Sequence, residues 1–260
     1  MQGAVVKFYE NLTDDYQHFF ADWKKEVHRQ GEVLNALIRR HLGMRPLTVL
    51  DCSCGIGTQA IGLALYGYQV HATDANPAAL ARAQQAAEAF GVTLTFEVAD
   101  LRSLNADVTG KFDVVLSGNN ALPHLRTEAD LLLAARQMRT RLRRDGLLLI
   151  SMHDYNQTVQ EQRQAAWTAT PPRVCDGAEG RRISFQIWDW AEDRRSYTLN
   201  HFLLRQRQNE WQTDLLTTKC RVLQQEELTA ILHAAGFFDI DWHLPAESGF
   251  YQPIVTARKK

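Results

Sequence analysis

The sequence predicts an α/β protein, a doubly wound parallel sheet that follows a helical segment and carries a small antiparallel β insertion. Three observations predict this class. Short apolar runs alternate with helical patterns over residues 48–152, which is typical of strands joined by crossover helices. The first strand leads through a glycine-rich turn into a helix. Over residues 183–221 the apolar residues instead recur at every second position, which is typical of antiparallel strands.

The composition fits one well-cored domain with a small insertion. The chain has 260 residues, 45% of them apolar, and a net charge of −1. A balanced charge gives no general attraction to nucleic acid, and no run of 18 apolar residues predicts a membrane span. The N-terminus lacks an apolar signal core, so we expect a cytoplasmic protein with neither nucleic acid nor membrane as partner. The four cysteines lack a matching pair or histidine cluster, so no metal site is expected.

The stretch from residue 48 to residue 76 carries the strongest functional signal. A predicted strand, helix and second strand span about residues 48–50, 58–66 and 69–73. Gly55 and Gly57 form the turn between the first strand and the helix. Glycines let backbone N–H groups approach a ligand closely, and the N-terminus of the new helix favours negative charge. The unit therefore predicts a cofactor site at this turn.

Two acidic residues indicate which cofactor this unit binds. Asp74 ends the second strand, where a carboxylate can bind two ribose hydroxyls, and it follows Asp51 by 74 − 51 = 23 residues, close to the separation of about 20 expected for this role. Asp51 directly precedes the turn, where it would repel a pyrophosphate but attract an ammonium or sulfonium group. This favours S-adenosylmethionine (SAM) over NAD(P), although GIGTQA also satisfies the dinucleotide pattern G-x-G-x-x-A.

The D-x-x-x-G-x-G turn resembles motif I of class I SAM-dependent methyltransferases, and the resemblance covers nearly the whole chain. Within that superfamily the chain is similar to the glycine and sarcosine N-methyltransferase group, through the segments VLDCSCGIGT, VHATDAN, VADL, LSGNNALPHL and LLISMHDYN. The resemblance implies a seven-stranded, Rossmann-like methyltransferase sheet whose last two strands are antiparallel. Those strands are expected at about 237–243 and 249–257, after a helix at 224–235.

The sequence patterns and the resemblance divide the chain into four expected segments. Residues 1–45 are expected to form an N-terminal lid, 46–156 the SAM-binding core, 157–223 an antiparallel substrate cap, and 224–260 the C-terminal part of the core. The first segment is rich in aromatic residues and contains an amphipathic helix at about 24–41, which can be a lid or a plain packing helix. The insertion is expected to begin with an irregular connection at 157–180. Three strands follow at 183–190, 196–205 and 211–221, with turns at 191–193 and 208–210, and they are expected to lie across the mouth of the site.

Residues at strand ends and in the lid complete the predicted cofactor site. Asp100 ends the third strand and can accept from the adenine amine, while Leu101 can offer its N–H to the ring; a plain loop aspartate is the alternative for Asp100. Arg29 can clamp the SAM carboxylate, or it can be a solvated helix arginine. The predicted cofactor-binding residues are Tyr16, Trp23, Arg29, Asp51, Cys52, Gly55, Gly57, Asp74, Ala75, Asp100, Leu101, Ser117 and Gly118.

The ends of the fourth and fifth strands are expected to border the transferred methyl group. The resemblance implies that Gly118-Asn119 lies beside the methyl group and that Tyr9 and Tyr16 cover the site. The predicted catalytic residues are His124 for proton handling and Asn119 and Tyr155 for positioning. The predicted substrate-binding residues are Tyr9, Asn119, Asp154 and Tyr155.

The acceptor is expected to be a small molecule that is methylated on nitrogen. Glycine-type members place an arginine where this chain has Asp154, and a carboxylate there would repel a carboxylate substrate. An amine or nitrogen heterocycle is therefore expected in place of glycine. O-methylation of a small metabolite, an NAD(P)-dependent oxidoreductase and a non-catalytic SAM-binding domain stay as alternatives, and the choice between monomer and homodimer stays open.

Overall fold

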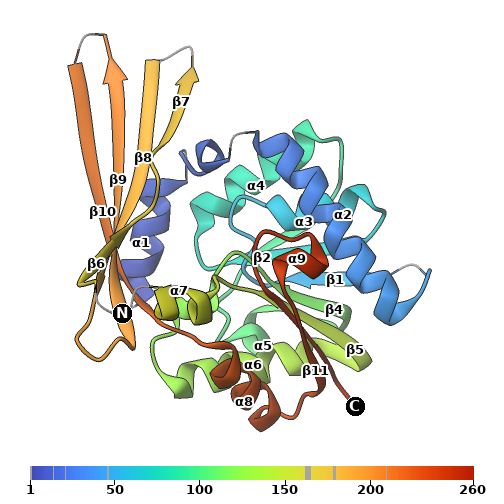
Figure 1. Ribbon diagram of the computed structural model, residues 1–260. Coiled ribbons are helices and arrows are strands. Elements are labelled where there is room, and N and C mark those ends of the chain that lie inside the picture. The colour runs from blue at the N-terminus through green and yellow to red at the C-terminus, as the bar shows by residue number, and fades with distance from the viewer. Residues whose placement is uncertain are drawn as a thin grey trace.

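A computed structural model describes residues 2–13, 15–20, 22–45, 47–161, 165–177, 180–208 and 210–260. The central sheet consists of β1 (Thr48–Asp51), β2 (Gln69–Asp74), β3 (Thr95–Val98), β4 (Phe112–Ser117), β5 (Leu142–Ser151), β11 (Phe238–His243) and β12 (Ile254–Arg258). Its strand order is β11-β12-β5-β4-β1-β2-β3 (Figure 1). The first five strands are parallel, and β12 runs antiparallel to both β5 and β11. The predicted seven-stranded, doubly wound fold is confirmed.

Helices cover both faces of this sheet (Figure 1). Its strands carry apolar side chains towards each face, and both sets must be buried. On one face, Val49 and Val114 pack in a cluster with residues of α2 (Trp23–Leu42), α3 (Thr58–Leu65) and α4 (Pro77–Ala89). On the other face, Leu50 and Val115 pack with residues of α5 (Leu104–Asp107), α6 (Glu128–Arg141) and α8 (Gln225–Ala234). The strand order reverses between β1 and β4, where ligands bind in open α/β sheets.

A second, antiparallel sheet projects from the core (Figure 1). It has the order β10-β9-β8-β6, with β7 also paired to β8, and we call it the projecting sheet. Its strands are β6 (Trp167–Ala169), β7 (Arg173–Gly177), β8 (Gly180–Trp190), β9 (Ser196–Arg207) and β10 (Glu210–Arg221). The sequence predicted three of these strands and an irregular connection before them. The connection instead contains α7 (Tyr155–Glu161) and the two short strands β6 and β7, which pair with β8. Asn209, in the second predicted turn, lies outside the described residues.

The first helix of the N-terminal segment lies between the projecting sheet and the core (Figure 1). The segment forms α1 (Gln2–Leu12), the short 3-10 helix η1 (Tyr16–Phe19) and then α2, which begins one residue before the predicted start and ends one residue after the predicted end. Asp22 caps α2 by accepting a hydrogen bond from the Lys25 N–H. The phenyl ring of Phe8 on α1 is buried in the same cluster as Tyr197 and Leu203 of the projecting sheet, so α1 joins the two parts.

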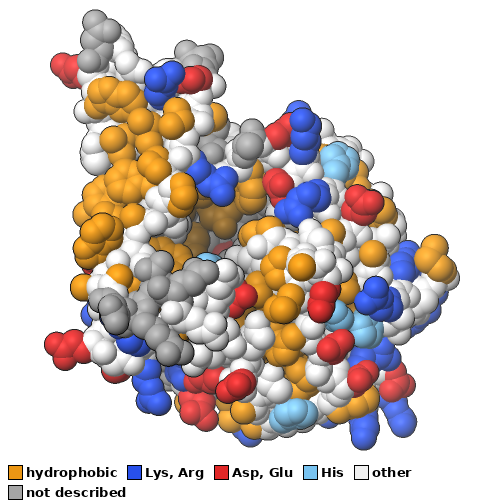
Figure 2. Space-filling view, viewed as in Figure 1, with side chains coloured by type: hydrophobic (Ala, Val, Ile, Leu, Met, Phe, Trp, Pro, Cys, Tyr) orange, Lys and Arg blue, Asp and Glu red, His pale blue; other side chains and the backbone are white. Residues whose placement is uncertain are grey.

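Two further short helices complete the chain, η2 (Leu122–His124) after β4 and α9 (Pro245–Ser248) between β11 and β12. Figure 2 shows a hollow between the projecting sheet and the core, and apolar side chains spread over the projecting sheet, where Trp167, Val174, Trp211 and Leu215 are exposed. No helix in the described ranges is both long and apolar enough to cross a membrane. Within the same ranges, no group of histidine, cysteine, aspartate and glutamate side chains could hold a metal ion.

Candidate active site

The glycine turn after β1 has the geometry that a bound ligand requires. Gly55 has a φ of 54° and Gly57 a φ of 89°, which are backbone conformations that glycine adopts at low cost. The Gly55 N–H donates to Asp74 Oδ2 (2.8 Å), and the Asn76 N–H donates to Asp74 Oδ1 (2.9 Å). No atom of the described structure lies within 4 Å of the point where a Gly55 side chain would begin. The turn therefore opens onto free space beside an anchored carboxylate.

Asp51 lies buried behind this turn and is incompletely satisfied. Its Oδ1 accepts a hydrogen bond from the Ser53 N–H (3.3 Å), while its Oδ2 has no hydrogen-bond partner among the described residues. Burial, opposed by the bond from Ser53 and reinforced by the charge of Asp74, raises the pKa of Asp51 to about 7. A positively charged group next to the turn would favour the ionised carboxylate. The residues present therefore fit a cofactor that carries a sulfonium or ammonium group.

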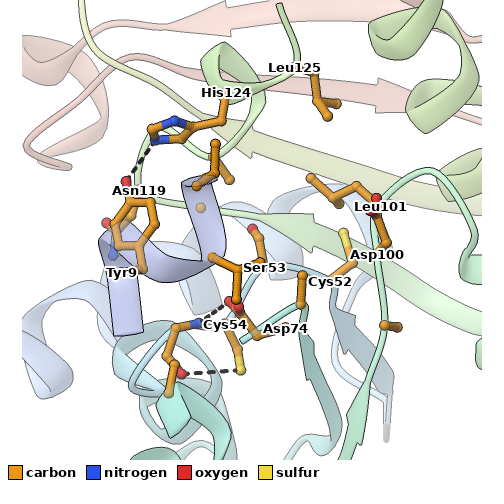
Figure 3. Close-up of a pocket in the computed structure, with 18 of the residues that line it drawn as sticks. Tyr9, Cys52, Ser53, Cys54, Asp74, Asp100, Leu101, Asn119, His124 and Leu125 are labelled. Atoms are coloured by element: carbon orange, nitrogen blue, oxygen red, sulfur yellow. Dashed lines mark hydrogen bonds between the residues drawn. The ribbon is translucent and has the colours of Figure 1, made fainter. Parts of the chain in front are cut away.

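A cavity of about 280 Å³ lies between the glycine turn and α1 (Figure 3). Its wall brings together eleven of the predicted site residues from the lid and from four strand ends: Tyr9, Tyr16, Cys52, Gly55, Asp74, Ala75, Asp100, Leu101, Gly118, Asn119 and His124. Parallel strands end at the same edge of the sheet, which is why residues so distant in sequence meet here. The volume is close to the lower limit of about 300 Å³ for small-molecule sites.

A tyrosine of the lid and a histidine of the core meet at the outer side of the cavity. Tyr9 Oη and His124 Nε2 are 2.7 Å apart, and the rings meet edge to face with centroids separated by 5.2 Å (Figure 3). On the other side of the imidazole, Cys220 Sγ lies 3.7 Å from Nδ1. Burial lowers the pKa of His124 to about 4, so the ring is uncharged at neutral pH. Its two ring nitrogens face Tyr9 Oη and Cys220 Sγ, so the imidazole can hold the Tyr9 hydroxyl in place without repelling a cation.

A charged network at the Asp100 side of the cavity was not predicted from the sequence. Asp100 accepts from the Arg102 N–H (2.8 Å) and pairs with the Arg102 guanidinium (2.9 Å), which also reaches Asp130 (3.4 Å). Thr127 caps α6 by accepting from the Asp130 N–H (3.1 Å). Thr127 followed three residues later by an acid is a helix-start signal that the sequence did contain. Nothing local predicts that Arg102 and Asp130, 28 residues apart, meet.

Four further predicted cofactor residues stand behind the wall. Asp51 is buried, and Gly57 packs against Ala83 and Ile61, which a side chain at position 57 would approach to 3.1 Å. Ser117 is buried with its hydroxyl 2.9 Å from that of Ser53. Trp23 Nε1 donates to Thr58 Oγ1 (2.9 Å), and Thr58, not Trp23, lines the cavity. These residues support the wall from behind.

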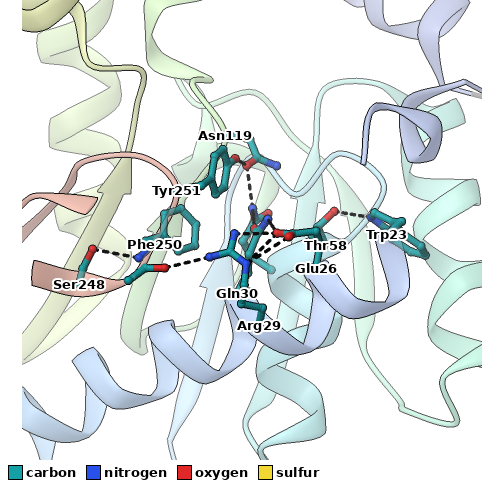
Figure 4. Close-up of polar contacts among 11 residues, drawn as sticks. Trp23, Glu26, Arg29, Gln30, Thr58, Asn119, Ser248, Phe250 and Tyr251 are labelled. Carbon is teal, nitrogen blue, oxygen red and sulfur yellow. Dashed lines mark hydrogen bonds and ion pairs between the residues drawn. The ribbon is translucent and has the colours of Figure 1, made fainter. Parts of the chain in front are cut away.

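The structure does not bring Arg29 to the cavity. Its guanidinium bonds to both oxygens of Glu26, with the shortest distance 2.7 Å, and to the carbonyl oxygen of Gly249 (2.9 Å) (Figure 4). The guanidinium carbon also lies 5.9 Å from the centre of the Tyr251 ring. With these contacts formed, Arg29 has a structural role in this conformation, in place of the predicted contact with the SAM carboxylate.

Tyr155 and Asp154 also lie off the cavity wall. The Tyr155 side chain is fully buried, and its hydroxyl accepts from Asn120 Nδ2 (3.0 Å) and lies 2.9 Å from the Tyr197 hydroxyl. Burial raises the pKa of Tyr155, so it cannot serve as a base at neutral pH. Asp154 Oδ1 accepts from the Gln157 N–H (2.9 Å) at the start of α7. In this conformation neither residue reaches the cavity, because α7 begins here, buries Tyr155 and uses the Asp154 carboxylate as its cap.

The projecting sheet does not close the cavity as predicted. Among the described residues, none of β6 to β10 lines it, whereas Val5, Val6 and Tyr9 of α1 do. The sheet instead holds α1 from behind: buried Asp15 forms an ion pair with Arg205 of β9, and its Oδ1 lies 3.8 Å from Arg182 Nε of β8. Residues of α1 therefore line the cavity, and the projecting sheet packs against the N-terminal segment from the other side.

Comparison with known proteins agrees with this geometry. Residues 49–146 match the family model described as a methyltransferase domain. A glycine/sarcosine N-methyltransferase from Parasynechococcus marenigrum is 30% identical over 154 residues, which are 59% of this chain and 53% of that protein. A glycine/sarcosine/dimethylglycine N-methyltransferase from Actinopolyspora halophila is 27% identical over 214 residues, 74% of this chain and 36% of that protein. The chain thus spans about half of the first relative and about a third of the second.

A solved structure has the same fold over almost the whole chain. The SAM-bound amino pentose methyltransferase CalS10 from Micromonospora echinaspora superposes with a TM-score of 0.74, at 18% identity, over 95% of each chain. The matched family model agrees with three features of the structure: the sheet order, the glycine turn between two acidic residues, and the buried Asp51 Oδ2 that has no hydrogen-bond partner among the described residues. Residues 49–146 therefore form a methyltransferase domain, and its cofactor is SAM.

Proposed function

We propose that this chain transfers a methyl group from SAM to the nitrogen of a small-molecule amine. One observation carries the proposal. An uncharged imidazole, His124, lies on the same cavity wall as the glycine turn and Asp74, under a lid tyrosine that it contacts at 2.7 Å. Held by His124, the Tyr9 hydroxyl would offer an oxygen lone pair beside the cofactor turn, which suits an N–H nucleophile. The two relatives named above are N-methyltransferases of glycine, sarcosine or dimethylglycine, and CalS10 is an amino pentose methyltransferase, which supports an amine as acceptor.

The cofactor would occupy the side of the cavity formed by strand ends. Asp74 would bind the ribose hydroxyls, and Asp100 with Leu101 would flank the adenine. Asp51 and the turn at Gly55 would face the charged amino-acid end. When bound, SAM supplies a methyl group activated by a positively charged sulfur.

The chain's own residues mainly align the acceptor and keep water out. The lid residues Val5, Val6 and Tyr9 close the cavity with largely apolar surface. His124 would hold the Tyr9 hydroxyl, whose oxygen would accept a hydrogen bond from the amine and so direct the nitrogen lone pair towards the methyl group. With a pKa of about 4 the imidazole is a weak base, so it orients the amine and does not remove a proton from an ammonium ion. The amine must therefore enter uncharged.

The location of Asp154 changes the expected acceptor. The sequence argument against glycine assumed that Asp154 faces the substrate, but its carboxylate caps α7 and does not line the cavity. Carboxylate-bearing amines therefore belong to the proposed acceptor class together with other small amines. Within this proposal residues 1–45 act as the lid, 46–156 and 224–260 as the core, and 157–223 as the inserted support of the lid.

An extract assay tests the proposal. Purified protein is incubated with a deproteinised metabolite extract and SAM labelled in its methyl group, and labelled products are identified by mass spectrometry. The expected result is a label on the nitrogen of a small amine, which is lost with the Asp74→Ala variant. A label on oxygen would contradict N-methylation. Binding of SAM by calorimetry without any labelled product would show a binding domain and not an enzyme.

A further inference from the structure

A chain of side-chain amides links helix α2 to the cavity wall (Figure 4). Gln30 Nε2 donates to Glu26 Oε2 (3.2 Å). Gln59 Nε2 on α3 donates to Gln30 Oε1 (2.7 Å) and to Asn119 Oδ1 (2.9 Å). Gln30 and Gln59 are both buried, so water does not replace these bonds. Every amide in the chain must therefore point in one direction or leave a buried polar atom unpaired.

Glu26 sets that direction. Its carboxylate is bound by the Arg29 guanidinium, which lowers the pKa of Glu26 and keeps it ionised. An ionised carboxylate only accepts hydrogen bonds. Gln30 must therefore turn its nitrogen towards Glu26 and its oxygen towards Gln59. Gln59 must therefore donate from Nε2 to Gln30 Oε1, and the second N–H of the same nitrogen donates to Asn119 Oδ1.

The Asn119 amide is consequently locked with its nitrogen on the open side. The hydroxyl of Tyr251 also donates to Asn119 Oδ1, so two donors occupy this oxygen. Among the described residues no acceptor bonds to Asn119 Nδ2, and Figure 4 shows the nitrogen pointing away from Tyr251. Asn119 lines the cavity and is itself held by the bond from its N–H to Ser151 Oγ (3.0 Å). The neighbouring Gly118 leaves room for Gln59, whose Cδ would lie 3.2 Å from any side chain there.

We infer that Gln59 is a positioning residue for methyl transfer, which holds Asn119 so that its Nδ2 donates a hydrogen bond to the methyl acceptor. This inference rests on the proposed function. It narrows the acceptor to amines that carry a hydrogen-bond-accepting atom, such as a carboxylate or hydroxyl oxygen, beside the nitrogen. A plain alkylamine would leave the Asn119 donor unpaired once water is excluded, and such sites discriminate strongly.

Two substitutions at position 59 separate direction from mere packing. Gln59→Glu keeps the shape but replaces both N–H donors by lone pairs, so Asn119 must turn its oxygen into the cavity. Gln59→Met keeps a similar volume and removes the hydrogen bond from position 59, so that Tyr251 still donates to Asn119 Oδ1. It also serves as the comparison if the buried glutamate of Gln59→Glu takes up a proton and becomes a donor again. Gln137→Glu is the matched control, because Gln137 Oε1 only accepts, from the Asn105 N–H (2.8 Å), and lies outside the cavity wall.

The orientation is read directly by nuclear magnetic resonance, without any acceptor. The side-chain NH2 signals of Asn119 are assigned by their loss in Asn119→Asp. We expect rapid exchange with water in the unchanged protein, and a downfield shift with slower exchange in Gln59→Glu, where the NH2 group pairs with the new carboxylate. Signals already protected in the unchanged protein and unmoved in Gln59→Glu would overturn the inference. Thermal unfolding of each variant confirms that it folds, and Glu26→Gln, which removes the directing carboxylate, provides the same comparison if Gln59→Glu does not.

Measurements of binding and turnover then show whether Asn119 Nδ2 donates to the methyl acceptor or to the cofactor. For S-adenosylhomocysteine, calorimetry should give dissociation constants within about threefold of the unchanged protein for both variants. For the amine found in the extract assay, kcat/KM should fall about 10- to 100-fold in Gln59→Glu, chiefly through KM, and less in Gln59→Met. A tenfold loss of S-adenosylhomocysteine affinity would place the Asn119 donor on the cofactor and refute the inference. An extract without any labelled product contradicts the proposed function alone, since the orientation experiment still decides the role of Gln59.

Discussion

Asp51 and Asp74 form two neighbouring carboxylates at the glycine turn, and they differ in how well they are paired. Asp74 accepts two backbone N–H groups, whereas Asp51 accepts one and keeps a buried oxygen without a partner among the described residues. Burial raises the pKa of both, and that of Asp51 reaches about 7. The protein thus maintains a destabilising charge next to the place where a cation would bind.

Asp51→Asn should stabilise the protein at pH 8 and weaken SAM binding. The folded-state pKa of about 7 exceeds the unfolded value of 3.8, so the cost of ionising Asp51 is absent below pH 3.8 and complete above about pH 7. We expect urea unfolding to give about 1–3 kcal/mol more stability at pH 8 and little change near pH 4. The SAM dissociation constant should rise about tenfold or more. Asp193→Asn on an exposed turn is the control, and a destabilised Asp51→Asn protein at pH 8 would contradict the prediction.

The contact between Tyr9 and His124 gives a second residue-scale prediction. Tyr9→Phe removes the hydroxyl that lies 2.7 Å from His124 Nε2 and keeps the ring that closes the cavity. We expect kcat to fall about tenfold while the SAM dissociation constant stays within twofold, measured by steady-state kinetics and calorimetry. Because the pKa of His124 is about 4, its titration should add no break to the pH–rate profile between pH 5 and 9. A break near pH 6.5 that disappears in His124→Gln would show a solvent-like imidazole.

Most of the predicted cofactor residues line the cavity whereas Tyr155 and Asp154 do not, and the difference has a physical reason. Gly55, Asp74 and Asp100 follow from strand, turn and strand-end positions, which short-range patterns define. Tyr155 and Asp154 were misplaced because a helix begins at Tyr155, and no apolar period near it indicates which way the side chains turn. The amide chain through Gln59 joins residues 30, 59 and 119, and only the packed structure brings these together.

At the scale of elements, helices α2 and α3 cross in close contact, and this contact makes the Gln30–Gln59 bond possible. Gly31 and Gly62 meet at the crossing, where a side chain on Gly62 would begin 2.6 Å from the Val27 carbonyl oxygen and 2.9 Å from Gly31 Cα. Two backbones can approach this closely only where neither residue carries a side chain. The crossing therefore places two buried glutamines next to each other.

Gly62→Ala should separate the two helices and weaken the polar chain. We expect a loss of about 2–4 kcal/mol in the free energy of unfolding, since the contact atoms are backbone and cannot rotate away. Chemical denaturation measures the loss. Gly3→Ala, in a helix with no atom within 4 Å of the new methyl group, should be neutral or slightly stabilising. Equal effects of the two substitutions would show that the crossing tolerates a methyl group.

The buried ion pair between Asp15 and Arg205 should hold the lid against the projecting sheet. Asp15→Ala removes the carboxylate that Arg205 and Arg182 share, while Arg205 keeps its ion pair with Asp214 of β10, so we expect a loss of about 1.5–3 kcal/mol. We expect faster hydrogen exchange in α1 and unchanged exchange in β1, β4 and β5, read by mass spectrometry. Asp176→Ala removes an exposed pair with Arg181 (2.7 Å) and should change neither region. Faster exchange throughout the sheet would mean that the pair stabilises the whole fold and not the lid.

At the scale of the whole molecule, the fold was predictable because strand order follows from alternation of elements, while the supporting role of the insertion was not. The three long strands were predicted from their period of two, but β6 and β7 are only three and five residues long and gain their structure from pairing with β8. The sequence placed the insertion over the mouth of the site. The structure places α1 there, because the aromatic face of α1 is covered by the projecting sheet.

Two buried histidines should make the whole protein sensitive to acid. Burial lowers the pKa of His124 and of His201 to about 4, below the unfolded value of 6.5, so their stabilising effect is complete above pH 6.5 and is lost as the pH falls towards 4. We expect the free energy of unfolding to fall by about 2–3 kcal/mol for each histidine across this interval. Urea titrations from pH 4 to pH 8 measure this decrease, and His201→Gln should remove the part that is due to His201. An unchanged slope in that variant would contradict the buried, uncharged state of His201.

The covering helix has a kinetic consequence. Because the same N-terminal segment both lines the cavity and supplies the hydroxyl that meets His124, a movement of α1 would widen the cavity and break this contact together. Release of spent cofactor past α1 would then separate Tyr9 from His124, and the helix would have to return before the next methyl transfer.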